Sequence, residues 1–202
     1  DNHIIVSAIE HPAILETAQH LRNYHGFDIT VLPIDQHGFT SVEDLRNAIQ
    51  PDTFLVSIMY ANNEIGVIQP IFELAEIAHE YNILFHTDAV QAAGQLPLDV
   101  KNLGVDLMSL SAHKFYGPKG VGLLYARRNT LTHPHLTGGS QENGLRAGTH
   151  NVPLIVGMAT ALNIVADRRS KDSSKMKVLR NQLIKSVLDT IPESLLTGHR
   201  TR

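Results

Sequence analysis

The sequence predicts an α/β fold, a mostly parallel sheet flanked by helices, and two observations carry that prediction. Short apolar runs alternate along the chain with segments whose apolar residues recur at helical spacing. Several runs are almost continuously hydrophobic, which is typical of parallel strands buried on both faces. The chain shows no internal repeat and no low-complexity segment. Because sheets of this class bind ligands at the carboxyl ends of their strands, the polar residues that follow each run are the candidate site.

The first strand and helix are predicted near the beginning of the chain. Residues 3–8 form a β-rich run. Pro12 then suits the first turn of a helix, in which Ile14, Ala18 and Leu21 share one face. The later apolar runs predict strands at 28–34, 53–60, 83–85, 107–110 and 121–125.

Further helices are expected between these strands and after them. Ser41 precedes a predicted helix over 42–49, and Pro70 opens another. Near the end of the chain, residues 151–167 and 177–191 each have a helical pattern. The polar connection between these two segments is itself compatible with helix.

Composition excludes several classes of protein and of site. The chain has 202 residues, of which 43% are hydrophobic, and a net charge of −3 without any block of like charge. Nucleic acids and anionic membranes are therefore not favoured partners. No apolar run is long enough to cross a bilayer, so we expect a soluble, cytoplasmic protein. Cysteine is absent, which excludes disulfides, thiolate metal sites and a cysteine nucleophile within these residues. Twelve histidines show no compact ligand spacing, and no metal site is predicted.

Lys114 lies just past a predicted buried strand, with Ser111 and His113 beside it. A lysine amine can form a Schiff base with pyridoxal phosphate, and a hydroxyl and an imidazole can bind its phosphate. An isolated lysine at a strand–turn junction is more often an ordinary surface residue.

Other strand ends carry residues that would suit the same cofactor, and each has a plainer interpretation. Asp88 could pair with a pyridinium nitrogen or simply cap a helix, and Gln91 lies three residues further on. His11 could stack on a ring or serve in acid–base chemistry, although a lone histidine at a strand end is more often structural. Segment 62–66 offers amides or merely a turn, and segment 144–149 suits an anion or a flexible connection.

The order and wording of five segments together closely resemble the cysteine desulfurases, the NifS/IscS-type members of the class-V aminotransferase family. The five segments are Ser-Ala-Ile-Glu-His (7–11), Ala-Asn-Asn-Glu-Ile-Gly-Val-Ile-Gln-Pro (61–70), His-Thr-Asp-Ala-Val-Gln (86–91), Ser-Ala-His-Lys-Phe-Tyr-Gly-Pro-Lys-Gly (111–120) and Gly-Gly-Ser-Gln-Glu-Asn-Gly-Leu-Arg-Ala-Gly-Thr (138–149). They span nearly the whole chain. The resemblance implies the large domain of a fold type I pyridoxal phosphate enzyme.

The resemblance also implies a role for each candidate residue. Lys114 would hold pyridoxal phosphate as a Schiff base and move protons, Asp88 would pair with the pyridine nitrogen, and His11 would stack on the ring as a catalytic residue. The remaining implied cofactor contacts are Asn63 and Gln91 near the phenolic oxygen, Ser111 and His113 on the phosphate, and Thr149 on the phosphate of a partner subunit. The last contact implies a homodimer.

The reaction implied is removal of sulfur from L-cysteine, which gives L-alanine and a persulfide on an enzyme cysteine. A sulfur-acceptor protein, such as an iron–sulfur scaffold, is a further implied partner. The runner-up activities are selenocysteine lyase or another class-V pyridoxal phosphate enzyme. A non-catalytic, desulfurase-like dimerisation or scaffold module is the alternative of a different class.

The sequence departs from the family pattern in three respects. The cysteine and a substrate-carboxylate arginine that relatives carry in a small C-terminal domain have no counterpart here, nor does an N-terminal phosphate loop. Asn143 stands where relatives typically have arginine. We therefore expect a fragment that cannot form a persulfide alone. In it, residues 1–150 would be the cofactor-binding domain, incomplete at its N-terminus, and residues 151–202 would be helices leading to the small domain.

Overall fold

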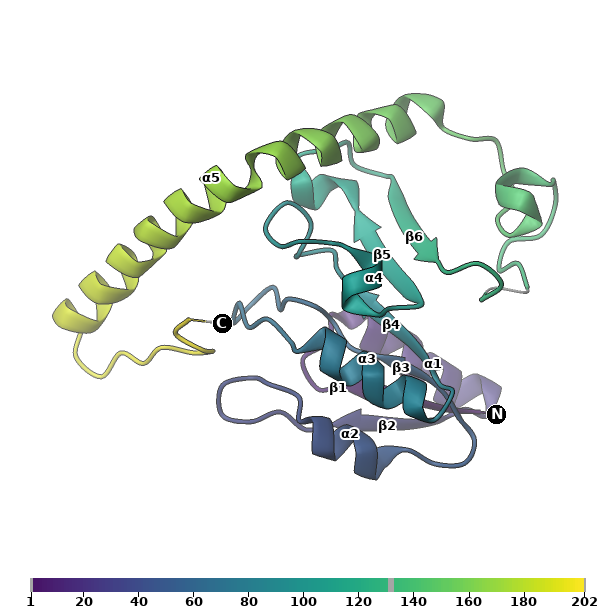
Figure 1. Cartoon of the computed structure of the whole chain (residues 1–202), viewed down its shortest axis with the longest axis horizontal. Helices are drawn as coiled ribbons and strands as arrows, with labels where there is room; N and C mark the ends of the chain where they lie inside the picture. The colour runs from purple at the N-terminus through teal and green to yellow at the C-terminus, as the bar shows by residue number, and fades with distance from the viewer. Residues whose placement is uncertain (1, 131–132, 202) are drawn as a thin grey trace.

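The computed structural model describes residues 2–130 and 133–201, and a six-stranded sheet lies at the centre of this part of the chain (Figure 1). The strands are β1 (His3–Ser7), β2 (Asp28–Leu32), β3 (Thr53–Ser57), β4 (Leu84–Asp88), β5 (Leu107–Ser111) and β6 (Gly122–Ala126). Their order is β2-β1-β3-β4-β5-β6, and every neighbouring pair is parallel except β5 and β6. The predicted mostly parallel α/β sheet is confirmed.

Helices connect the strands and flank the sheet, largely where the sequence places them. The helical elements are α1 (Pro12–His25), α2 (Val42–Ala48), α3 (Ile71–Glu80), α4 (Val100–Leu103), α5 (Val152–Thr190) and the 3-10 turns η1 (Ala112–Phe115) and η2 (Gln141–Gly144). Ser41 caps α2, because its Oγ accepts the backbone N–H of Asp44 at 3.2 Å. The short elements α4, η1 and η2 are not among the predicted ones.

Alternation along the strands divides the core between two faces. Ile4 and Val6 of β1 pack against Ala18 of α1, whereas Ile5 belongs to the larger core with Leu74 of α3. Coverage of both faces does not extend to β6, where the exposed fractions of Leu123 and Leu124 are 45% and 52%. Both faces of the sheet are thus covered at its centre but not at this edge.

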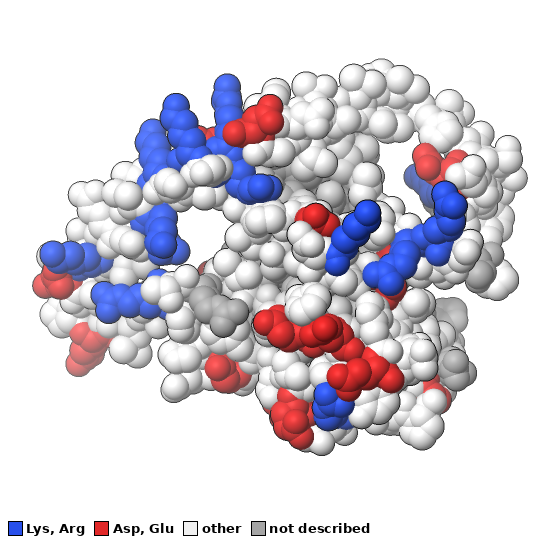
Figure 2. All heavy atoms as spheres, in the orientation of Figure 1, with Lys and Arg blue, Asp and Glu red and all other residues white. Residues whose placement is uncertain are grey.

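One continuous helix, α5, replaces the two predicted C-terminal helices, because the polar connection 168–175 is helical as well. Near its beginning α5 joins the core through Met158, and its second half runs away from the sheet with Leu179 and Leu183 exposed (Figure 1). Lys and Arg side chains gather along α5, while acidic side chains gather over α2 and α3 (Figure 2). No helix among the described residues is long and apolar enough to cross a membrane.

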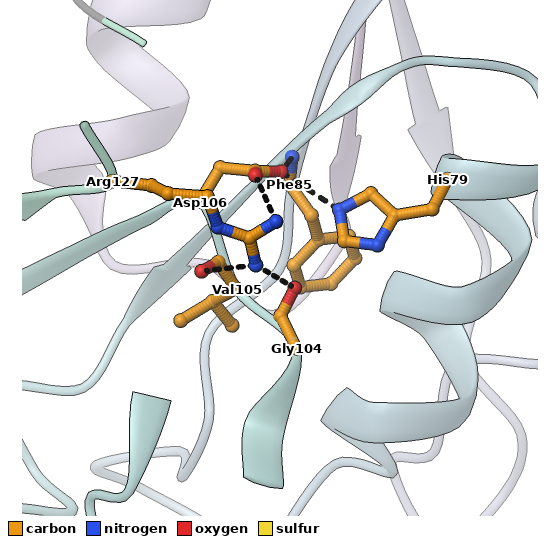
Figure 3. Close-up of polar contacts among 6 residues, drawn as sticks. All are labelled: His79, Phe85, Gly104, Val105, Asp106 and Arg127. Atoms are coloured by element: carbon orange, nitrogen blue, oxygen red, sulfur yellow. Dashed lines mark hydrogen bonds and ion pairs between the residues drawn. The ribbon is translucent and has the colours of Figure 1, made fainter. Parts of the chain in front are cut away.

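A buried carboxylate fastens the edge of the sheet where β4 and β5 begin (Figure 3). Asp106 Oδ2 lies 2.8 Å from His79 Nε2 of α3 and accepts the Phe85 backbone N–H at 2.9 Å. Its Oδ1 lies 3.2 Å from Arg127, which also donates to the carbonyl groups of Gly104 and Val105. Helix α3, strands β4 and β5 and the segment after β6 therefore meet at a single charged group.

Strand β4 continues to Asp88, three residues beyond the end that the sequence predicts. The polar residues His86, Thr87 and Asp88 are all buried, and they pair with Leu107, Met108 and Ser109 of β5. Hydrophobicity alone underestimates this strand because its last residues are polar although they are buried in the sheet. The extension makes Asp88 the terminal residue of a central strand.

Candidate functional site

Four neighbouring parallel strands, β1, β3, β4 and β5, end at the same edge of the sheet. His11 follows β1, Asn63 follows β3, Asp88 ends β4, and Ser111 ends β5 just before Lys114. The strand order reverses between β1 and β3, and ligands of open α/β sheets bind outside the carboxyl ends at such a reversal. The topology therefore gathers the predicted residues from four separate segments at one edge.

Asp88 is the buried acid of this edge, with an exposed fraction of 8%. Its Oδ1 accepts the Val90 backbone N–H at 2.9 Å, and its backbone carbonyl accepts the Tyr60 N–H at 2.9 Å. Burial raises the pKa of Asp88, and the Val90 hydrogen bond and the nearby charge of His11 oppose that rise. An acid held in this way gains from a cationic partner, which would stabilise its charged form.

A row of polar side chains lies beneath Asp88 on the same face of the sheet. Ser57 Oγ lies 2.7 Å from His86 Nδ1, and His86 Nε2 lies 2.9 Å from Ser109 Oγ. Burial lowers the pKa of His86 to about 4, so its ring is neutral at pH 7 and bridges the two hydroxyl groups. Sequence reasoning missed this row, although a histidine two residues before Asp88 in a strand shares its face.

The turn η1 presents the other predicted group. Ser111 Oγ lies 2.9 Å from His113 Nδ1, and both side chains are at least partly exposed. The Gly117 backbone N–H donates to the Ala112 carbonyl at 2.9 Å. Glycine permits this close approach, since a Cβ at this position would lie 2.9 Å from the same oxygen. A hydroxyl and an imidazole thus meet on a tight turn, an arrangement that suits a phosphate.

Lys114 lies in η1 and its side chain is exposed. It borders a small cavity of about 30 Å³ between η1 and α5, together with Gly94, Asp172 and Met176. Neither His11 nor Asp88 borders that cavity. Among the described residues, no ion pair joins Lys114 to Asp88.

The two amides after β3 differ in what holds them. Asn62 Nδ2 donates to the Ile9 carbonyl at 2.9 Å, and Asn62 Oδ1 accepts the N–H groups of Glu64 and Ile65 at 2.8 Å each. Asn63 is exposed, and Gln91 is half-buried just beyond Asp88. Asn62 thus shapes the loop and Asn63 is its accessible amide.

Thr149 lies in the exposed segment between η2 and α5. In the described part of the chain it makes no hydrogen bond to the other candidate residues, so the structure does not bring it into this site. Asn143 adopts a left-handed conformation (φ 56°), which asparagine tolerates better than most residues. Glu142 and His150 lie 3.0 Å apart and join the two ends of this segment.

The residues of this edge fit the group that the family resemblance implies. A buried acid at the end of β4 suits a pyridinium nitrogen, and the Ser111–His113 pair suits a phosphate. Nothing among the described residues gathers three potential metal ligands. Sequence reasoning also missed Glu10, a buried acid next to His11 within the Ser-Ala-Ile-Glu-His segment. A charged residue between a buried strand and a helix start is the signal that could have found it.

Comparison with known proteins identifies similar sequences and structures over nearly the whole chain. The aminotransferase class-V family model matches residues 1–202. The chain is 52% identical to cysteine desulfurase IscS of Dictyoglomus turgidum (strain DSM 6724 / Z-1310) over 199 residues, which covers 98% of this chain and 50% of that protein. It is likewise 52% identical to cysteine desulfurase IscS of Methanosarcina thermophila, covering 99% and 49% of the two chains. A solved NifS-like protein superposes with a TM-score of 0.90 at 44% identity, over 94% of this chain and 52% of the other. The chain spans about half the length of the curated relatives it matches.

Proposed function

This chain belongs to the class-V aminotransferase family, and from that membership we propose that it forms the cofactor-binding half of a pyridoxal phosphate-dependent cysteine desulfurase. The observation that carries the proposal is the carboxyl edge, where buried Asp88 ends β4 between the segments that bear His11 and Lys114. The two IscS relatives, each 52% identical over nearly all of this chain, support the substrate. L-Cysteine would be converted to L-alanine.

Each residue has a proposed task around the cofactor. When bound, pyridoxal phosphate withdraws the electrons that remain when the substrate Cα–H bond breaks. Asp88 would hold a negative charge toward the pyridine nitrogen and so favour its protonated form. Lys114 Nζ would hold the cofactor covalently and would carry protons at the substrate carbon atoms. His11 would cover one face of the ring.

The remaining contacts fix the orientation of the cofactor. Ser111 and His113 would hold the phosphate, while the amides of Asn63 and Gln91 would bind near the phenolic oxygen. Thr149 would reach the phosphate bound by the partner subunit of a homodimer. This role accounts for an exposed Thr149 that makes no hydrogen bond to the other candidates of its own chain.

Sulfur removal needs a thiol that these residues do not supply, because they include no cysteine. In the proposed reaction, L-cysteine and an enzyme thiol give L-alanine and an enzyme persulfide. The substrate Cβ–S bond breaks, an S–S bond forms and Cβ gains a proton, so no external oxidant or reductant is consumed. A sulfur-acceptor protein would then take the terminal sulfur.

The organisation and location of the protein are part of the proposal. We infer that residues 1–150 form the cofactor domain and that 151–202 lead toward a further domain, with Met158 anchoring α5 on the sheet. The cytoplasmic location expected from the sequence stays a prediction that cell fractionation tests.

The proposed lysine is tested by Lys114→Ala, with Lys119→Ala as the matched control on the exposed part of the same segment. Wild type and Lys119→Ala should bind pyridoxal phosphate with visible absorbance, and borohydride reduction should leave its mass on the peptide that contains Lys114. Lys114→Ala should lose both signals. An unchanged spectrum in Lys114→Ala would overturn the assignment.

The substrate is tested by measuring alanine release from L-cysteine and from L-selenocysteine, with an added thiol as sulfur acceptor. Faster release from cysteine supports the desulfurase. Release from selenocysteine alone would favour a selenocysteine lyase, and cofactor binding without release from either would favour a non-catalytic module.

A further inference from the structure

Glu10 is a buried acid that the proposed reaction leaves without a task. It lies between β1 and α1, directly before His11, and its exposed fraction is 5%. Its Oε1 accepts the Ser7 hydroxyl at 2.6 Å and the Met59 backbone N–H at 2.7 Å. This carboxyl group therefore joins the end of β1 to the segment after β3, across the reversal in strand order where a ligand is expected.

The second carboxyl oxygen of Glu10 differs from the first in its hydrogen bonding. Oε2 is buried and has no hydrogen-bond partner among the described residues. An ionised carboxylate would leave negative charge on this unpaired oxygen, whereas a carboxylic acid carries its proton there and is neutral. Burial is the main cause that raises the pKa of Glu10 to about 7; the negative charge of Asp88 also contributes to this rise, and the hydrogen bonds from Ser7 and Met59 oppose it.

The segments that Glu10 joins are those that carry two proposed cofactor contacts. His11 is the next residue, and its Nδ1 accepts the Ala13 N–H at 3.1 Å, which makes it the cap of α1. On the other side, Asn62 ties the loop that bears Asn63 back to the Ile9 carbonyl. Glu10 and Asn62 thus fasten the same two segments from both sides. A change at Glu10 would move His11 relative to the end of β4.

We propose that Glu10 is a positioning residue of the cofactor site, a buried carboxyl group that fixes the His11 segment to the segment after β3. While its second oxygen carries a proton, it leaves Asp88 to carry the negative charge that the pyridine nitrogen requires. A second carboxylate ionised beside Asp88 would shift the Asp88 pKa upward and weaken that pairing. The positioning role rests on the proposed function, whereas the protonation state does not.

The protonation state is tested in the cofactor-free full chain by the infrared band of protonated carboxyl groups between pH 5 and pH 8. Wild type and the control Glu16→Gln, which alters an exposed acid of α1, should show a band that disappears with a midpoint near pH 7. Glu10→Gln should lack it. Ser7→Ala removes a hydrogen bond that favours the charged form, so it should move the midpoint to higher pH. The absence of any band specific to Glu10 would overturn the neutral acid.

The positioning role is tested by the dissociation constant for pyridoxal phosphate in the same variants. Gln retains an acceptor oxygen and neutrality, so Glu10→Gln should bind within about threefold of wild type. Glu10→Ala should bind about 10–100-fold more weakly, as expected when a supporting partner of a binding residue is lost. Wild-type affinity in Glu10→Ala would overturn the role. If wild type itself bound no pyridoxal phosphate, the proposed function and the positioning role would both fail, while the infrared result would still decide the proton on Glu10.

Discussion

Asp88 and Asp106 are both buried aspartates, and they lie at opposite edges of the same sheet. Asp106, where β5 begins, is surrounded by groups that favour its charge: an imidazole, a guanidinium and a backbone N–H (Figure 3). Asp88, at the end of β4, has the Val90 N–H as a hydrogen-bond donor, and burial raises its pKa. The fold itself supplies cationic and hydrogen-bonding partners for Asp106, whereas Asp88 would gain from a cationic partner that a ligand could provide.

This difference separates a group that stabilises the fold from one that serves a site. The Asp106 cluster joins four segments and leaves no charge for a ligand to compensate. Asp88 lies beside a second buried acid, Glu10, and above the neutral ring of His86. Perturbed titratable groups of this kind gather where ligands bind and chemistry occurs. Substitutions at the two edges should therefore affect different measurements.

The largest effect is expected for Asp88→Asn. Asparagine keeps an oxygen for the Val90 N–H but holds no negative charge, so alanine release from cysteine in the presence of the added thiol should fall about 10²–10³-fold, as when one stabilising group of an active site is removed. The unfolding midpoint should stay equal or rise, because an unfavourable buried charge is removed. Alanine release and urea unfolding measure the two quantities. Asp189→Asn, an exposed change on α5, is the control, and full activity in Asp88→Asn would remove the basis of the comparison.

Asp106→Ala should show the opposite profile. It removes the acceptor of the Phe85 N–H and the common partner of His79 and Arg127, so the free energy of unfolding should fall by about 2–3 kcal/mol. Pyridoxal phosphate affinity of the folded protein should not change. The control is Glu80→Ala, which breaks an exposed ion pair with Arg46 and should leave urea unfolding unchanged. A weaker affinity for the cofactor in Asp106→Ala would mean that the two edges are coupled.

The sequence predicts the sheet well because its strands and helices follow local patterns of apolar residues. It also brings Asp88, His11 and Lys114 to attention, although their roles come from the family resemblance rather than from periodicity. The Asp106 cluster is different, since His79 and Arg127 lie 27 and 21 residues away along the chain and meet it only after the sheet has formed. No local sequence pattern predicts that contact.

Glu10 was missed for a related physical reason. Its charge between a strand and a helix draws attention to it, but nothing in its sequence neighbours reveals that the Met59 backbone contacts it. The polar segment 168–175 separates two predicted helices and is itself compatible with helix, and its residues continue α5 without a break.

An effect of similar size, which depends on pH, should distinguish His86 from the Asp106 cluster. Burial lowers the pKa of His86 from 6.5 to about 4, so between these values the unfolded chain binds a proton that the folded chain does not. Its contribution to stability is therefore complete above pH 6.5 and is lost as pH falls toward 4, by up to about 3 kcal/mol. The free energy of unfolding of His86→Gln should depend less on pH than that of wild type over this window. Parallel curves for the two proteins would show that His86 is charged in the fold.

The smallest effect is expected for Arg127→Ala, which tests how the charge of Asp106 is shared. The Arg127 side chain is 47% exposed and lies 3.2 Å from Asp106 Oδ1. Its loss leaves Asp106 with His79 and the Phe85 N–H, so the free energy of unfolding should fall by only about 1 kcal/mol. The loss should shrink at high salt, because the pair is partly screened by solvent ions. Urea unfolding at low and high ionic strength measures this, with the neighbouring exposed Arg128→Ala as control. A loss as large as that of Asp106→Ala would place most of the stabilisation in the guanidinium, and the contacts with the half-buried imidazole and the backbone would then be secondary.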